Sequence, residues 1–339
     1  MLRRRYGARA AQAGRVVRLT FGVDRVTRLG GLPAGTLDLA AHLGGLSPEE
    51  AERELFLPLD LGAWGPPVEP RPAPGGGWVC CELGAPGDED TFARLLETLP
   101  PDADAPTVAA AAQHWRLPVN EYRCRAPQPA TPPELSVKAR GIARVLTDSS
   151  LGGVRIVDMT VMWAGPLATR KLAELGADVV KVEPECRMDG TRGSAMFDAL
   201  NAGKRRADLD LRDTAQRAEF MDLVRDADVV IDNFSPRVMP NLGLTHNDLL
   251  AVNPRIISVS MPAFPAGSPW RDRVSYGVGV HALSGLGDNG DGTFSEPSVA
   301  YPDPLAGLAA YATVLELLDR GVPTHAEVAM FDVVAQLQP

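Results

Sequence analysis

The chain has 339 residues, of which 45% are hydrophobic and 23% are charged, and its formal net charge is −9 at pH 7. This composition is typical of a globular protein with one large or two ordinary domains. The negative charge disfavours nucleic acid and anionic membranes as main partners. The sequence has neither an apolar run of membrane-spanning length nor a signal peptide, so we expect a cytoplasmic protein. Its five histidines and four cysteines lack metal-ligand spacing, and we expect no bound metal.

Residues 1–135 are rich in proline, glycine and alanine. Two stretches, 62–77 and 126–134, have the composition of linkers. Between these stretches the sequence shows short strand-like runs and apolar residues at helical spacing. It predicts strands at 78–83 and 119–123 and helices at 88–99 and 107–117. We therefore expect residues 1–135 to form a smaller α+β domain.

From residue 150 onward the pattern becomes regular, and apolar stretches of strand length alternate with amphipathic stretches of helical length. Strands that are apolar throughout favour a parallel sheet with helices on both faces. We therefore predict an α/β fold with a Rossmann-like catalytic domain over residues 150–339. A dinucleotide site is not expected, because no G-x-G-x-x-G motif follows the first strand. The strands are predicted at 153–160, 178–183, 228–234 and 255–264, and the helices at 165–177, 215–227 and 245–254.

Asp303 and Pro304 stand where a long apolar helix is expected to begin, in the segment "YPDPLAGLAAYATVLELLDRG". Aspartate is a favoured N-cap residue, and capping alone accounts for its presence. A carboxylate at a helix N-terminus also stays ionised, and an ionised carboxylate can act as a covalent nucleophile. These residues alone leave both hypotheses open.

A series of motifs after residue 150 occurs in a fixed order. The series is "GVRIVDMTVMWAGPLATRKLAELGADVVKVEP", "NAGKRRADLDLRD", "DADVVIDNFSPRVMPNLGL", "NPRIISVSMPAF" and "YPDPLAGLAAYATVLELLDR". With these motifs, residues 150–339 resemble the class III coenzyme A transferases of the CaiB/BaiF type. That family includes formyl-CoA transferase, carnitine CoA-transferase and α-methylacyl-CoA racemase. The resemblance implies a transferase.

The resemblance places the family's catalytic aspartate on Asp303. It implies that Asp303 attacks an acyl-CoA thioester, and that CoA or the acyl group passes to a carboxylic acid through a covalent aspartyl intermediate. Coenzyme A is then bound as part of the substrate. A carboxylate is a weak nucleophile, so the site must hold the thioester close and stabilise the oxyanion. We expect the backbone amides of Leu305 and Ala306 to serve this purpose, and Gly307 to allow close approach in the substrate pocket.

Contacts to CoA follow from the resemblance position by position. The segment from Leu209 to Arg212 matches a strip that contacts adenine and phosphate, and arginine suits phosphate binding. Isolated charges are usually solvated, so a plain surface role for Arg212 and Arg273 stays open. The residues expected to bind CoA are Trp163, Ala164, Leu209, Arg212, Asn233, Phe234 and Arg273.

Two positions in the substrate region depart from the family's pattern. Tyr276 stands where the racemase branch has a histidine, and tyrosine, with a pKa of about 10, is a poor base at neutral pH. Racemisation is therefore disfavoured. His281 lies five residues later, and we expect a structural role for it. Trp163 replaces a glutamine of the formyl-CoA transferase branch, which suggests a less polar acyl group.

The order of the chain is also unusual for the family. Residues 76–122 weakly resemble the family's smaller domain, which in relatives follows the segment that matches 325–334. We interpret the chain as a permuted member, and fusion of an unrelated N-terminal region to a catalytic half is the alternative. The family forms interlocked dimers, so a homodimer is expected. Two other functions stay open: a CoA-thioester lyase, dehydratase or epimerase, and a non-catalytic binding protein of the same fold.

Overall fold

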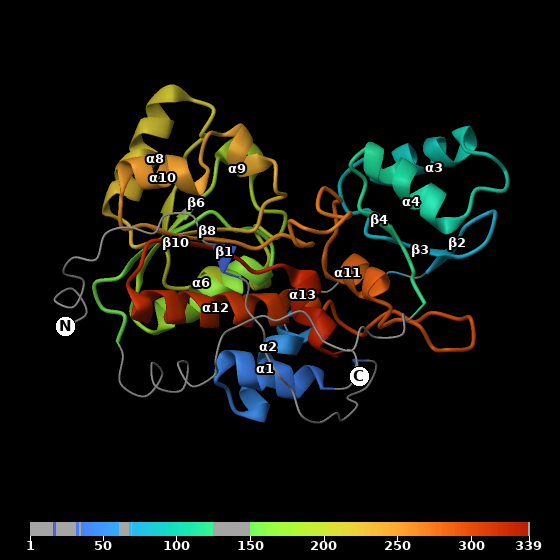
Figure 1. Ribbon diagram of the computed structural model, residues 1–339, viewed down its shortest axis with the longest axis horizontal. Helices are drawn as coiled ribbons and strands as arrows, with labels where there is room; N and C mark the ends of the chain where they lie inside the picture. Colours follow the sequence, from blue (N-terminus) through green and yellow to red (C-terminus); the bar gives the residue numbers. More distant parts are fainter. Residues whose placement is uncertain are drawn as a thin grey trace.

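The computed structural model describes residues 16–17, 32–33, 35–60, 68, 70–124 and 150–337. Figure 1 shows a large sheet layered with helices and, at its right, a smaller domain with its own sheet. The predicted linker at 126–134 and part of the one at 62–77 lie outside the described residues. Of the helices that are described, none has both the length and the apolar character needed to cross a bilayer.

The large sheet has seven strands in the order β1-β10-β9-β8-β5-β6-β7, and every neighbouring pair is parallel. Because the strands are parallel, their carboxyl ends all meet at one edge of the sheet, where ligands of open α/β sheets bind. The strands are β1 (Val16–Val17), β5 (Arg155–Asp158), β6 (Asp178–Val182), β7 (Arg205–Ala207), β8 (Val229–Asp232), β9 (Ile257–Ser260) and β10 (Thr324–Glu327).

Successive residues of the central strands point to opposite faces of this sheet. Ile156 joins the apolar core that includes α6 and α12, whereas Val157 joins the core that includes α8 and α10. Figure 1 shows these two pairs of helices on opposite sides of the sheet. The predicted α/β fold is therefore confirmed. The helices are α6 (Ala164–Glu174), α7 (Ala195–Asn201), α8 (Thr214–Asp226), α9 (Val238–Asn241), α10 (His246–Val252), α11 (Gly277–Ser284), α12 (Pro302–Arg320) and α13 (Met330–Val334).

The small domain is built around three antiparallel strands and two helices. Its elements are β2 (Arg71–Pro72), β3 (Trp78–Cys81), α3 (Asp88–Thr98), α4 (Ala105–His114) and β4 (Val119–Glu121). Val79, Phe92 and Val108 belong to a separate apolar core. The Asp104 side chain accepts a hydrogen bond of 3.0 Å from the Thr107 N–H and so fixes the start of α4.

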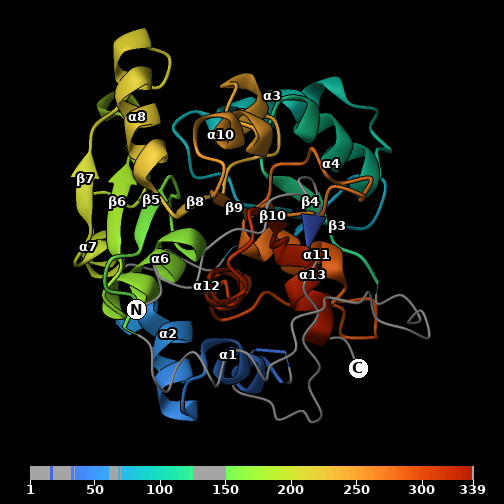
Figure 2. The same ribbon diagram turned by 60° about the vertical axis from the view of Figure 1, so that its left-hand side comes forward.

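The remaining described part of 1–135 belongs to the large domain. Helices α1 (Thr36–Gly44) and α2 (Pro48–Asp60) lie beneath α12, as Figure 2 shows. Leu39, Leu43 and Leu55 are fully buried in the same core as α12. Composition had suggested one small domain over 1–135, but its described part is limited to 70–124. The leucine faces of α1 and α2 need an apolar partner, which α12 provides.

Residues 272–278, here called the docking segment, join the two domains. The Gln113 side chain, on α4, accepts from the Val274 N–H at 2.7 Å and donates to the Val274 carbonyl at 2.8 Å. Arg273 forms an ion pair with Glu121 of β4. The docking segment leads directly into α11, so the small domain controls the position of the start of that helix.

Candidate active site

Asp303 is the second residue of α12, which begins at Pro302. The N-cap prediction was therefore wrong, because Tyr301 occupies that position. The Asp303 N–H donates to the Ala300 carbonyl at 3.0 Å and fixes the backbone there. The Asp303 carboxyl group is partly buried and accepts a hydrogen bond from the backbone N–H of Gly277. The side chain therefore lies at the amino end of α11, although it belongs to α12.

Gly277 is the first residue of α11, and a glycine is required there. A Cβ atom on Gly277 would lie 2.1 Å from Asp303 Oδ2 and 3.1 Å from the Ala300 Cβ. The first distance is far below van der Waals contact, so any larger residue would displace the carboxyl group. This close approach fixes the position of the Asp303 side chain.

A second carboxyl group, that of Glu82, lies at the same helix end. Glu82 directly follows β3 in the small domain. Its Oε2 accepts from the Tyr276 N–H at 2.9 Å, and its Oε1 accepts from the Val278 N–H at 3.0 Å. Our sequence reasoning did not single out Glu82. A glutamate directly after the apolar run "WVCC" was the available signal, but its partners are 194 and 196 positions away.

The two carboxyl groups share an unusual electrostatic setting. Burial raises the pKa of Asp303 to about 7, and the Gly277 N–H only partly opposes this shift. Burial, and then the charge of Asp303, raises the pKa of Glu82 to about 8. Burial and the charge of Glu82 also raise the pKa of Glu296 to about 8. Because the two carboxyl groups repel each other when both are ionised, the pair as a whole takes up a proton more readily than isolated carboxyl groups do.

The predicted oxyanion donors do not serve that role. The Leu305 N–H donates to the Tyr301 carbonyl at 3.2 Å, and Leu305 and Ala306 are 0% and 1% exposed. Buried amides inside a helix do not face a substrate oxygen. The expectation failed because α12 begins before Asp303 rather than after it. Instead, the amino end of α11 presents backbone N–H groups to this site.

The loop between β5 and α6 is held at the carboxyl edge of the large sheet. Asn233, which follows β8, accepts from the Val161 N–H at 2.9 Å and donates to the Val161 carbonyl at 2.8 Å. The Met162 N–H donates to Asp189 Oδ2 at 2.9 Å, and Met162 has a φ of 69°. A left-handed backbone at a residue other than glycine is strained, and such strain gathers at ligand sites.

The other residues expected to bind CoA fall into two groups. Trp163, Ala164 and Leu209 are each 3% exposed and belong to the apolar cores, so the structure places them as packing residues. Arg212 is exposed, with its guanidinium paired to Asp210 at 2.7 Å. Arg212 is therefore on the surface, where it can meet a phosphate.

Arg273 and Tyr276 both belong to the docking segment. The guanidinium of Arg273 is bound to Glu121 and is only 18% exposed, so it is committed to the domain interface rather than to a phosphate. Tyr276 is 45% exposed and directly precedes Gly277. The structure therefore brings Tyr276 to the border of the site around Asp303.

Gly307 and His281 have structural explanations. A Cβ atom on Gly307 would lie 2.5 Å from the carbonyl oxygen of Ala164, so the glycine permits close contact between α12 and α6. His281 is 2% exposed; its Nδ1 lies 2.9 Å from the Tyr301 hydroxyl and its Nε2 lies 3.0 Å from the Ser295 carbonyl. Burial lowers the pKa of His281 to about 4, which leaves the ring neutral.

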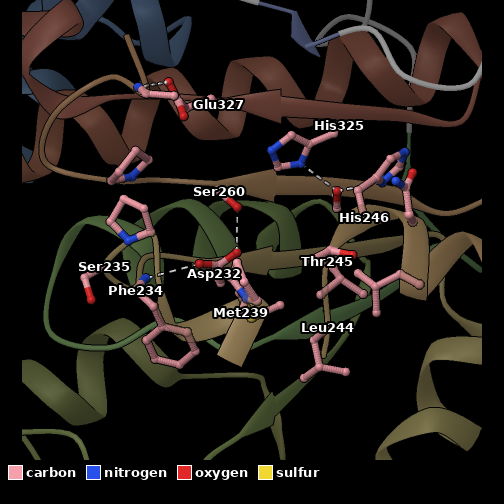
Figure 3. Close-up of a pocket in the computed structure, with 18 of the residues that line it drawn as sticks. Asp232, Phe234, Ser235, Met239, Leu244, Thr245, His246, Ser260, His325 and Glu327 are labelled. Atoms are coloured by element: carbon pink, nitrogen blue, oxygen red, sulfur yellow. Dashed lines mark hydrogen bonds between the residues drawn. The ribbon is translucent and has the colours of Figure 1, made fainter. Parts of the chain in front are cut away.

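A cavity of about 580 Å³ lies on the face of the sheet that α9 and α10 cover, next to Phe234. Figure 3 shows Asp232, Ser260 and Glu327 on neighbouring strands along its wall. Ser260 is in register with both acidic residues and donates to Asp232 Oδ2 at 2.8 Å. Neither Asp303 nor any residue of the small domain lines this cavity.

The lining of this cavity carries charged side chains of both signs, because Arg271 lies on its wall together with Asp232 and Glu327. Burial raises the pKa of Asp232 to about 6. Ser258 Oγ lies 2.9 Å from His246 Nδ1 and 2.8 Å from His325 Nδ1. Burial lowers the pKa of both histidines. Over the described ranges, no group of three or more histidine, cysteine, aspartate or glutamate residues is placed to hold a metal.

The chain is similar in sequence to known CoA-transferases. The chain is 37% identical over 142 residues to acetyl-CoA:oxalate CoA-transferase from Acetobacter aceti, which covers 40% of the chain and 36% of the relative. It is 32% identical over 205 residues to succinate–glutarate CoA-transferase from Agrobacterium fabrum, which covers 54% of the chain and 51% of the relative. The chain therefore spans about half or less of the length of these relatives.

Solved structures show the same likeness. Rv3272 from Mycobacterium tuberculosis matches with a TM-score of 0.52 and 31% identity, over 56% of each chain. A CaiB/BaiF family protein from Brucella suis matches with a TM-score of 0.51 and 30% identity, over 56% of this chain and 55% of the other. The family model for CoA-transferase family III matches residues 151–339, more than half of the sequence. The chain therefore belongs to CoA-transferase family III.

Proposed function

We propose that this protein transfers coenzyme A between an acyl-CoA thioester and a carboxylic acid through a covalent intermediate on Asp303. One observation carries the proposal: a partly exposed carboxylate is fixed against the amino end of α11 by the Gly277 N–H, at the junction of the two domains. Burial strips water from this carboxylate and raises its pKa to about 7, so it is ionised but poorly solvated near neutral pH.

The proposed reaction needs no net proton transfer. The Asp303 oxygen attacks the thioester carbon, the carbon–sulfur bond breaks, and a mixed anhydride and CoA thiolate form. The thiolate then attacks the Asp303 carbonyl carbon, which releases the donor acid and leaves an aspartyl-CoA thioester. An acceptor carboxylate attacks this thioester, which releases the thiolate and forms a second mixed anhydride; the thiolate then attacks the acceptor carbonyl carbon, and the bond to the Asp303 oxygen breaks. Asp303 is regenerated as a carboxylate. The positive end of the α11 dipole favours each oxyanion formed beside it.

The substrates proposed are an acyl-CoA and a carboxylic acid. Relatives named acetyl-CoA:oxalate and succinate–glutarate CoA-transferase support this class. For CoA we propose the carboxyl edge of the sheet, along the loop that Asn233 orders and toward the exposed Arg212.

Trapping the intermediate tests the proposal. The full chain is incubated with a panel of acyl-CoAs and acids, hydroxylamine is added, and the protein is examined by mass spectrometry. We expect hydroxamate on Asp303, formed as the amine displaces CoA from the aspartyl thioester. Asp303→Asn is the control and should give none. CoA exchange without any adduct at Asp303 would contradict the covalent mechanism.

Exchange of an α-proton is a second candidate function, favoured by one observation. Asp303 and Glu82 form a pair of carboxyl groups with pKa values near 7 and 8, which suits one group to accept a proton and the other to donate one. Acyl-CoA incubated with the protein in deuterium oxide would then gain deuterium at the α-carbon without CoA exchange. CoA exchange without deuterium gain would rule this candidate out.

Two further proposals concern assembly. We propose that residues 70–124 are the family's small domain placed before the large one. A chain rebuilt with 35–124 after 150–337 should then keep its activity, and loss of activity in a folded product would contradict the permutation.

We also propose a homodimer, which sedimentation should detect as twice 36.1 kDa. A monomer at micromolar concentration would contradict it.

A further inference from the structure

Glu82 differs from the other residues of the domain interface in what it binds. Its two carboxyl oxygens accept from the N–H groups of Tyr276 and Val278, at 2.9 and 3.0 Å. The first N–H groups of a helix have no carbonyl partner within the helix and need an acceptor from elsewhere. Glu82 therefore caps α11 from a different domain. Its own backbone is fixed in turn, because the Glu82 N–H donates to the Pro118 carbonyl at 3.0 Å.

The first turn of α11 is shaped to receive two carboxyl groups. A Cβ atom on Gly279 would lie 2.6 Å from Glu82 Oε2 and 2.6 Å from Asn120 Nδ2. A Cβ atom on Gly277 would lie 2.1 Å from Asp303 Oδ2. Glycine weakens a helix, so two glycines in one turn need a reason. Gly277 therefore makes room for the Asp303 carboxyl group, and Gly279 makes room for the Glu82 carboxyl group together with Asn120 and with Ser275 Oγ, which lies 2.4 Å from such a Cβ atom.

We propose that Glu82 is a positioning residue for Asp303: it anchors the first turn of α11 to the small domain, and that turn holds the nucleophile through Gly277. This inference rests on the proposed function, because it takes Asp303 as the nucleophile. The active site is then complete only while the small domain is docked. Without Glu82, two N–H groups at the helix end lose their acceptor, and the turn that carries Gly277 loosens.

The charged groups that face Glu82 come from three elements. Asp303 belongs to α12, Glu296 belongs to the loop before α12, and Cys80 and Cys81 belong to β3. Burial raises the pKa of both thiols, that of Cys81 to about 12, so both stay neutral. The groups that change charge near neutral pH are therefore the three carboxyl groups.

The protonation of Glu82 has a consequence for the reaction. A protonated Glu82 anchors α11 without adding charge beside Asp303, and the pKa of Glu82, raised by burial to about 8, favours this form near neutral pH. At higher pH an ionised Glu82 places a second negative charge where each oxyanion must form. Transfer should therefore weaken above pH 8 in the wild type. Glu82→Gln, which is always neutral, should not weaken there.

The first test is hydrogen–deuterium exchange of the full chain, which needs no substrate. The variants are Glu82→Ala, Glu82→Gln and a matched control, Glu97→Gln, which changes an exposed glutamate of the same domain. In Glu82→Ala we expect the amides of residues 276–280 to exchange about tenfold faster than in the wild type. In Glu82→Gln the amide oxygen still accepts, so a smaller increase is expected. The control should match the wild type.

The second test is kinetic. Glu82→Ala should lower kcat about tenfold or more, with KM for the acyl-CoA changed by less than about threefold. Glu82→Gln should restore most of kcat near pH 7 and should lack the decrease above pH 8. A residue needed only for folding would change the thermal midpoint of unfolding but not the shape of the pH profile.

The two tests separate this inference from the proposed function. Wild-type exchange at residues 276–280 in Glu82→Ala would overturn the inference whatever the activities are. An unchanged kcat and pH profile in both Glu82 variants would also overturn it. Faster exchange, in a protein whose wild type transfers CoA from no donor, would instead overturn the proposed function. If Glu82→Ala does not fold, the exchange and pH profile of Glu82→Gln decide the question.

Discussion

The amino ends of α11 and α12 lie close together but are used in different ways. At α12 the backbone N–H groups of Asp303 and Leu305 bond to carbonyls just before the helix. At α11 the N–H groups of Gly277 and Val278 bond to carboxyl groups from α12 and from the small domain. The helix that carries Asp303 therefore does not supply the backbone donor that its carboxyl group binds. Although Asp303 belongs to α12, changes at the start of α11 should therefore affect activity strongly.

The largest expected effect comes from Asp303 itself. Asp303→Asn keeps the shape of the side chain but removes the nucleophile. It should lower the rate of CoA transfer by about 1,000-fold or more, as loss of a covalent catalyst does. The measurement is acyl-CoA exchange followed by mass spectrometry. Transfer at the wild-type rate in Asp303→Asn would contradict a functional difference between the two helix ends, because the donors of α11 would then surround a residue without a catalytic role.

The next effect tests α11. Gly277→Ala places a methyl group 2.1 Å from the present position of Asp303 Oδ2 and must displace the carboxylate. We expect about a 100-fold loss of kcat/KM, the scale of a 1 Å misplacement of a reacting group. Gly84→Ala is the matched control, because a Cβ atom there meets nothing within 4 Å. Equal losses in the two variants would show that the contact at Gly277 is not the cause.

The third prediction uses pH. In the proposed mechanism the ionised form of Asp303 is the nucleophile, and burial raises the pKa of this carboxyl group to about 7. kcat/KM should therefore fall about tenfold for each pH unit below that value. The measurement is CoA transfer between pH 5 and pH 8 in buffers of constant ionic strength. A profile that stays flat down to pH 5 would show that the carboxylate is far better solvated than its burial indicates.

The smallest expected effect concerns stability. Because the folded state raises the pKa of Asp303 from 3.8 to about 7, it favours the protonated form. The free energy of unfolding should then decrease as pH rises between these two values. Asp303→Asn never ionises, so at pH 8 it should be more stable than the wild type by about 1–2 kcal/mol, after allowance for partial exposure. Urea unfolding at pH 8 and pH 4 measures this difference, which should vanish at pH 4.

The sequence predicts the large domain well, because its strands and helices are set by local apolar patterns. Strands such as β8 and helices such as α8 lie where periodicity places them. Composition predicts α1 and α2 less well, because their packing partner α12 lies more than 240 positions away. A proline- and glycine-rich region looks uniform in sequence, although its described parts pack in two different places.

The site is less predictable than the fold for a similar physical reason. Asp303 could be predicted because its motif resembles a known family. Glu82 could not, because no local pattern links the end of β3 to the start of α11. The donors expected at Leu305 and Ala306 followed from one assumption about where α12 begins, and a shift of two residues removed them. Long-range capping is invisible to sequence periodicity.

The docking segment connects the small domain to the site around Asp303. At one end of this segment, Gln113 and Glu121 bind Val274 and Arg273. At the other end the segment continues into the first turn of α11, where the Gly277 N–H donates to Asp303. A small rotation of residues 70–124 is therefore transmitted along a few residues of backbone to the Gly277 N–H. The placement of residues 70–124 and the position of the Asp303 carboxyl group are thus linked by a continuous path of backbone and hydrogen bonds.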